Sequence, residues 1–136
     1  MKLLIVDAQG GGFGKQLVSG VKRSFPEVEI TAVGANSVAT GAMLKAGADH
    51  AATGENAVIV GCRNADLIAG PVGIVIADAL YGEITPAMAL AVAQSKAKRI
   101  LIPYQHCDNI IAGVSELSVG KLIQCAVDEI GKFVNP

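Results

Sequence analysis

Residues 2–7, with the sequence KLLIVD, form a short and almost continuous apolar run that ends at an acidic residue and is followed at once by glycines. A strand with one solvent-exposed face alternates apolar and polar side chains, and this run does not alternate. Continuous apolar strands are typical of parallel sheets that helices cover on both faces. The beginning of the chain therefore predicts a buried strand of an α/β protein.

The rest of the chain repeats this alternation of strand and helix. Further strands are predicted at 29–34, 66–69 and 99–102, with weaker candidates at 49–52 and 109–114. Helices are predicted at 13–25, 37–46, 54–62, 74–80, 86–95 and 118–133. Such alternation indicates a parallel sheet with helices on both faces. We expect one three-layer, Rossmann-like, doubly wound α/β domain over residues 1–136, with a mostly parallel sheet of five or six strands in the order 3-2-1-4-5.

Composition excludes several classes of protein. Hydrophobic residues make up 51% of the chain and charged residues 17%, which excludes intrinsic disorder. Eleven basic and twelve acidic residues leave a net charge of −1, so nucleic acid and anionic membranes are not expected as partners. The apolar start is too short for a secretory signal, and the three cysteines are widely spaced. A cytoplasmic location with reduced thiols is therefore expected.

The loop that follows the first strand, residues 7–15 with the sequence DAQGGGFGK, is the strongest functional signal. Ligands of doubly wound sheets bind beyond the carboxyl ends of the strands, where the strand order reverses. Glycines allow close backbone approach, and the next helix presents free N–H groups that favour an anion. We therefore predict that this loop binds a nucleotide or a phosphorylated small molecule. The residues assigned to it are Asp7, Gln9, Gly10, Gly11, Gly12, Phe13, Gly14 and Lys15.

The loop does not match a known phosphate-binding motif in full. In the NTPase P-loop pattern, Gln9 stands where the leading glycine belongs and Gln16 replaces the magnesium-binding Ser or Thr. In the pattern G-x-G-x-x-G, Lys15 replaces the third glycine. No acidic residue for a ribose follows the second strand, and neither tyrosine is followed by lysine four positions later. The cofactor therefore remains open, as does the alternative that the glycines only let the first helix pack on the sheet.

Other loops are expected at the same edge of the sheet and would complete one pocket. Their candidate binding residues are Asn36, Ser37, Thr53, Glu55, Asn56, Gly70, Pro71, Gly73, Glu83 and Thr85. Each of these residues also has a purely structural interpretation beside the functional one. Asn36 or Ser37, Thr53 and Thr85 are suited to cap helices, 70–73 to a tight turn, and Glu83 to a surface loop.

Two alternative functions stay open beside ligand binding. A small enzyme would use Asp7, Glu55 or Glu83 as an acid or base over the same pocket. A structural protein would use the helices at 74–80 and 87–97 as contacts between subunits of a homo-oligomer. The chain has 21 alanines, and these helices contain several of them. Asp78 lies within the first of these apolar helices, where a carboxylate needs a partner in the pocket or across an interface.

The triplet His106-Cys107-Asp108 is expected beyond the fifth strand. Adjacent loop residues rarely converge on one atom, and no second histidine lies at ligand spacing. We therefore expect no metal site, and no role is assigned to His106 or Cys107.

Several runs of the chain together resemble the bacterial family named domain of unknown function 3842. They are DAQGGGFGK (7–15), VGANSVATGAMLKAGAD (33–49), ATGENAV (52–58), ADLIAGPVGI (65–74), GEITPAMA (82–89), and KRILIP (98–103) with Cys107. The resemblance spans almost the whole chain and implies a small stand-alone Rossmann-like domain, but no reaction. The positions it emphasises are Asp7, Gln9, Gly10–Gly14, Asn36, Thr53–Asn56, Gly70-Pro71 and Glu83–Pro86.

Overall fold

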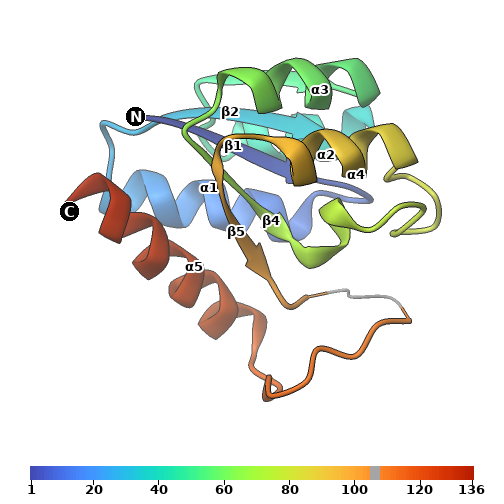
Figure 1. Ribbon diagram of the computed structural model, residues 1–136. Coiled ribbons are helices and arrows are strands. Elements are labelled where there is room, and N and C mark those ends of the chain that lie inside the picture. Colours follow the sequence, from blue (N-terminus) through green and yellow to red (C-terminus); the bar gives the residue numbers. More distant parts are fainter. Residues whose placement is uncertain (105–107) are drawn as a thin grey trace.

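A five-stranded, fully parallel sheet forms the centre of the computed structural model, which describes residues 1–104 and 108–136 (Figure 1). The strands are β1 (Lys2–Asp7), β2 (Glu29–Gly34), β3 (His50–Thr53), β4 (Leu67–Pro71) and β5 (Lys98–Ile102). Their order is β3-β2-β1-β4-β5, and β1 pairs with both β2 and β4. The predicted order and the doubly wound, Rossmann-like α/β class are therefore confirmed.

Helices cover both faces of this sheet. They are α1 (Gly12–Ser24), α2 (Ser37–Lys45), α3 (Glu55–Asn64), the 3-10 helix η1 (Val72–Val75), α4 (Pro86–Gln94) and α5 (Val119–Val134). Buried side chains of α1, α2 and α5 belong to one hydrophobic cluster, and those of α3 and α4 belong to a second. Figure 1 shows α1 and α5 on one side of the sheet and α3 and α4 on the other.

The packing of β1 explains why the residues between its two ends are all apolar. Leu3 and Ile5 pack into the cluster under α1 and α5, whereas Leu4 and Val6 pack into the cluster under α3 and α4. Successive strand residues point to opposite faces, so a strand covered on both faces has no position for a polar side chain. The strand is polar only at its two ends, at the exposed Lys2 and the buried Asp7.

The helix predicted at 74–80 is wrong. The chain forms η1 and then a series of turns, in which Asp78, Leu80, Tyr81 and Gly82 have positive φ values between 57° and 83°. A right-handed helix does not allow positive φ. The buried members of this run, Ile74, Ala79 and Leu80, therefore enter the core individually and not along one face of a helix. Asp78 lies exposed in these turns and not in an apolar helix.

Two further local predictions are wrong. Residues 109–114 form no strand and pair with no strand of the described sheet. Ile110 in this segment is 94% exposed. Thr53 is not a helix cap but the last residue of β3, paired with Gly34, and Gly54 precedes α3 without a side-chain cap. The caps at Asn36 and Thr85 are confirmed, since their side chains accept hydrogen bonds from the amides of Ala39 and Met88.

Candidate functional site

A small cavity of about 290 Å³ lies at the carboxyl edge of the sheet, over the loop between β1 and α1. This is the end of the sheet at which doubly wound folds bind ligands. Its lining residues are Asp7, Ala8, Gln9, Gly10, Gly11, Gly12, Phe13, Gln16, Tyr104 and Val119. Seven of these ten are consecutive in sequence, so the glycine loop itself forms most of the cavity wall.

The glycines of this loop differ in what they do. Gly11 has φ of 72°, and a Cβ there would lie 2.7 Å from the Cα atom of Ala39. A Cβ on Gly14 would lie 2.8 Å from the Cβ atom of Asp7. At Gly10 and Gly12, by contrast, a Cβ would meet nothing within 4 Å. Gly11 and Gly14 are therefore needed for packing, whereas Gly10 and Gly12 leave the backbone open to the cavity.

The first turn of α1 contributes unpaired backbone donors. The amide of Gly14 donates to Oδ2 of Asp7 at 2.6 Å, and the amide of Lys15 donates to the carbonyl of Gly11 at 2.9 Å. Within residues 1–104 and 108–136, the amides of Gly12 and Phe13 have no protein acceptor. Helix N-termini with free amides attract anions, because the amides and the helix dipole both present positive charge.

Asp7 is the one charged residue that is buried among the described residues, with 2% of its surface exposed. Burial raises the pKa of its carboxyl group above 3.8; hydrogen bonds from the amides of Ala8 and Gly14 oppose this shift, and the nearby carboxylate of Glu83 adds to it. The neutral acid is therefore favoured more than in an ordinary aspartate. Asp7 lies directly beneath the open amides of α1.

Glu83 joins three loops at this edge through one carboxylate. Its Oε1 accepts the amide of Gln9 at 2.8 Å, and its Oε2 accepts Nδ2 of Asn36 at 2.6 Å. The same Nδ2 donates to the carbonyl of Gln9 at 2.8 Å, and Oδ1 of Asn36 caps α2. The loops after β1 and β2 and the turns before α4 are thereby held together, with Gln9 at a φ of 55°.

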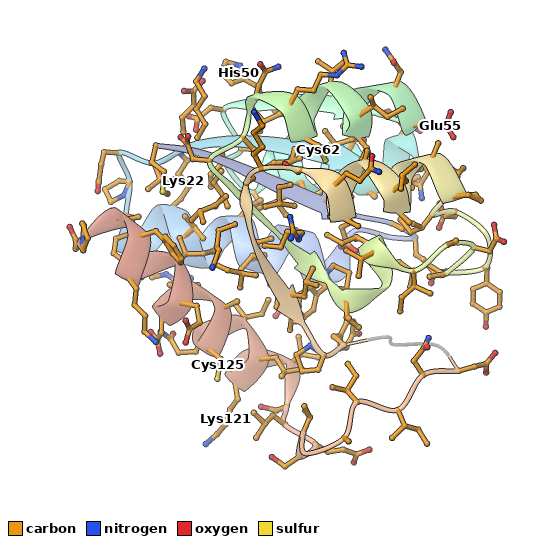
Figure 2. All side chains as sticks on the ribbon, in the orientation of Figure 1. Lys22, His50, Glu55, Cys62, Lys121 and Cys125 are labelled. Atoms are coloured by element: carbon orange, nitrogen blue, oxygen red, sulfur yellow. The ribbon has the colours of Figure 1, made fainter. Side chains whose placement is uncertain are left out.

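The other candidates form a second polar group or a packing contact outside the glycine-loop cavity. Glu55 accepts a hydrogen bond from Oγ1 of Thr85 at 2.6 Å and projects outward at the start of α3 (Figure 2). Thr53 shares a hydrogen bond of 2.7 Å with Thr40. Ser37 and Asn56 are exposed in the first turns of their helices. None of these residues lines the cavity.

The turn at 70–73 serves the contact between β1 and β4. A Cβ on Gly70 would press against the carbonyl oxygen of Val6, so only glycine allows the strands to lie this close. Pro71 ends β4 and Gly73 lies in η1, both buried. Neither Pro71 nor Gly73 is among the described residues that line the glycine-loop cavity. Lys15 does not line it either, since its side chain is exposed on the outer side of α1.

Tyr104 and Val119 are site residues that the sequence reasoning missed. The ring of Tyr104 stacks on Phe13 with centroids 4.6 Å apart and planes at 13°. The tyrosine follows β5 by two residues, so it reaches the same carboxyl edge as the glycine loop. Its position shortly after a predicted parallel strand is the signal in the sequence that could have identified it. Val119, the first residue of α5, had no such signal.

Cysteines and charged clusters add no metal centre in the described part of the chain. No group of three or more His, Cys, Asp or Glu residues gathers within residues 1–104 and 108–136. Burial raises the pKa of the Cys62 thiol to about 11. His106 and Cys107 lie outside the described residues. None of the helices that the structure describes is both long and apolar enough to cross a membrane.

Comparisons with known proteins give a family and a distant structural neighbour. No curated protein matches the chain. A solved structure with a similar arrangement is that of a dodecameric FMN-dependent UbiX-like decarboxylase from Escherichia coli O157:H7. It is 22% identical, with a TM-score of 0.47, and the match covers 96% of this chain and 76% of that one. The family model described as domain of unknown function (DUF3842) matches residues 2–135, which confirms the resemblance in sequence: the chain belongs to this family.

Proposed function

We propose that the chain binds a nucleotide or another phosphorylated small molecule at the glycine loop, with a phosphate on the amides of Gly12 and Phe13. The observation that carries this proposal is the pair of free amides at the start of a 13-residue helix, in the wall of a cavity of about 290 Å³. Phosphate oxygens are suited to such donors, and no side chain stands over Gly10 or Gly12 to exclude them.

The size of the cavity limits what it holds. Pockets that enclose whole drug-sized ligands measure roughly 300–1,000 Å³. A cavity of about 290 Å³ is large enough for a phosphate and the group attached to it, but not for a complete nucleotide. The stacked rings of Phe13 and Tyr104 supply an aromatic wall beside the amides. The remainder of a larger ligand would therefore extend out of this cavity.

Asp7 makes this site sensitive to protonation. An ionised carboxylate beneath the loop repels a bound anion, whereas the neutral acid does not. Burial already favours the neutral form. Anion binding and protonation of Asp7 are therefore coupled, and each favours the other.

Gly12→Val tests the site. The new side chain meets no protein atom within 4 Å of its Cβ, so the fold should be kept while the amides become covered. Gly41→Val, on the exposed surface of α2, is the matched control because its Cβ also meets nothing within 4 Å. Both variants and the wild type would be screened by thermal shift with inorganic phosphate, AMP and a sugar phosphate, and any hit measured by calorimetry.

At least one of these compounds should raise the melting temperature of the wild type and of Gly41→Val but not of Gly12→Val. A panel that leaves the folded wild type unchanged would speak against the proposal. So would a compound that stabilises all three proteins equally.

A second candidate function is acid–base catalysis by Asp7, favoured by its raised pKa and its place in the cavity wall. Both oxygens of Glu83 are occupied by hydrogen bonds to the loops, so Glu83 positions the loop in this reading. Glu55 lies outside the described cavity lining. Turnover that Asp7→Asn abolishes while ligand binding remains would separate an enzyme from a binding protein.

We further propose that the chain forms a homo-oligomer through α3 and α4. A surface hollow of about 570 Å³ lies between these two helices. Its lining includes Leu90, which is 55% exposed, and several small alanine side chains that allow close approach. An exposed leucine beside a hollow with several small apolar side chains is suited to a self-complementary contact.

A further inference from the structure

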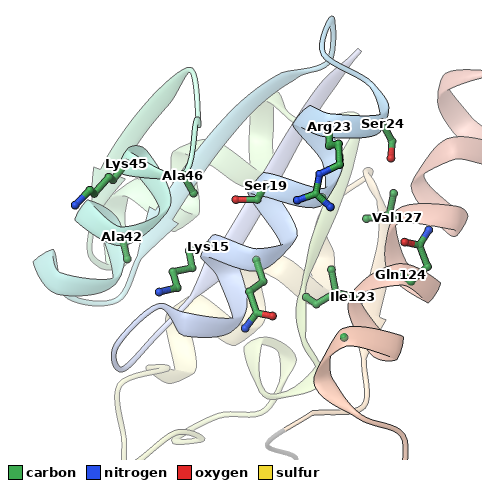
Figure 3. Close-up of a pocket in the computed structure, with 13 residues that line it drawn as sticks. Lys15, Ser19, Arg23, Ser24, Ala42, Lys45, Ala46, Ile123, Gln124 and Val127 are labelled. Carbon is green, nitrogen blue, oxygen red and sulfur yellow. The ribbon is translucent and has the colours of Figure 1, made fainter.

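A hollow of about 750 Å³ lies on the outer face of α1 between α2 and α5 (Figure 3). Small residues help to keep it open, among them Gly20 on α1, Ala42 on α2 and Ala46 directly after α2. At Gly20 a Cβ would lie 3.0 Å from Cγ2 of Val127, so α1 and α5 approach closely at the floor. We refer to this hollow as the α1 groove.

The charge in the α1 groove is of one sign. Lys15 and Arg23 of α1 and Lys45 of α2 line it, and none of its described lining residues is acidic. All three side chains are exposed, and none forms an ion pair among the described residues. Lys22 on the same helix instead pairs with Asp49 at 2.7 Å. Three uncompensated cations around one hollow produce a positive potential that attracts anions.

The spacing of these cations fits a ligand with more than one anionic group. Lys15 and Arg23 are eight residues apart on α1, which corresponds to about 12 Å along the helix axis. Ser19 lies between them and offers a hydroxyl, and Figure 3 shows all three along α1. Lys45 lines the groove from α2, and its side chain extends away from α1 in this view. On the α5 side, Gln124 donates to Asp128 at 2.8 Å, and this carboxylate is not part of the lining.

We infer that the α1 groove is a binding site for a small polyanion that carries two or more phosphate groups. Two helices bound the groove, and it holds three cations, whereas nucleic-acid sites neutralise more phosphates along an open track. Gln16 lines both this groove and the glycine-loop cavity, so the two sites adjoin. The α1 groove does not use the free amides of Gly12 and Phe13, and its function is independent of theirs.

The test uses inorganic triphosphate as the probe and Gly12→Val as the background, so that the glycine loop is covered in every protein compared. Arg23→Gln with Lys45→Gln removes two groove cations on exposed positions far from the loop. Lys2→Gln with Lys98→Gln removes two exposed lysines outside the groove and gives the same net charge. Binding would be measured by calorimetry at low and at physiological salt, after circular dichroism has shown that each variant is folded.

Triphosphate should bind the Gly12→Val protein, more weakly as salt rises. The groove variant should bind at least about tenfold more weakly, since two charge-assisted contacts are lost, and the control variant should bind within about twofold. Equal weakening by the two double variants would overturn the inference, because the effect would then come from net charge. Absence of triphosphate binding in the Gly12→Val protein would overturn it as well and leave the glycine-loop proposal untouched.

Discussion

Asp7 links the stability of the fold to pH. Burial raises its pKa in the folded chain above the ordinary value of 3.8. An acid whose folded pKa is raised contributes stability that is present below the unfolded pKa and is lost as the pH rises through the folded pKa. Above that range the ionised, buried carboxylate is a cost to the fold. The same side chain that would couple ligand binding to protons thus weakens the native state at neutral pH.

Asp7→Asn should remove this cost, because asparagine stays neutral and keeps an oxygen for the amide of Gly14. The free energy of unfolding of the variant minus that of the wild type should rise as the pH increases from the ordinary aspartate pKa of 3.8 through the raised pKa of the folded chain. Urea unfolding across this range measures the difference. Asp78→Asn, which removes an exposed charge, controls for net charge. A difference that stays flat or falls with pH would contradict the explanation.

The individual residues of the site could be predicted only in part from the sequence. Asp7 and the glycines were identified because they follow a buried strand directly, and their position needed only the strand boundary. The cap at Thr53 was wrong because the pairing of β3 with β2 extends to Thr53 and claims it for the sheet. Pairing between strands overrides the local preference of threonine for a helix cap. The sequence around Thr53 alone does not indicate this pairing.

The turns between η1 and α4 are the element in which sequence reasoning failed most clearly. An apolar run without a polar face has no period that separates helix from buried turn. The structure instead closes the segment with hydrogen bonds from the amide of Asp78 to the carbonyl of Ile84 at 2.7 Å and from the amide of Ile84 to the carbonyl of Ala79 at 3.2 Å. Glu83 then anchors it to Gln9, 74 positions earlier.

Glu83→Gln should loosen this anchor. A glutamine amide offers one acceptor oxygen where the carboxylate offers two, so either the Gln9 amide or Nδ2 of Asn36 loses its hydrogen bond to residue 83, and Nδ2 keeps only its bond to the carbonyl of Gln9. The expected loss of stability is about 1–3 kcal/mol, with faster hydrogen exchange at residues 9–12.

Glu55→Gln is the matched control for that substitution. Glu55 is exposed and accepts one hydrogen bond, from Oγ1 of Thr85, which glutamine also accepts. The control should change stability by less than about 0.5 kcal/mol and leave loop exchange as in the wild type. If the two variants behave alike, Glu83 does not anchor the loops.

For the whole molecule, the strand order was predictable and the surface hollows were not. Right-handed crossovers between buried parallel strands leave few topologies, and the order β3-β2-β1-β4-β5 is one of the common doubly wound orders among them. The glycine-loop cavity, however, needs Tyr104 and Val119 from the last third of the chain, and the α1 groove needs the packing of three helices. Such hollows depend on side-chain shapes across elements, which no local pattern in the sequence encodes.

The assembly of the molecule depends on the face formed by α3 and α4. If two copies meet there, Leu90 is buried between them, and Leu90→Glu replaces this apolar contact by a carboxylate that must lose its hydration on association. Light scattering should then give a multiple of 13.8 kDa for the wild type and about the single-chain mass for the variant. Leu44→Glu introduces the same charge on α2, at a leucine that is 51% exposed, and should leave the assembly intact. A monomeric wild type, or dissociation by both substitutions alike, would show that the hollow between α3 and α4 is not a subunit contact.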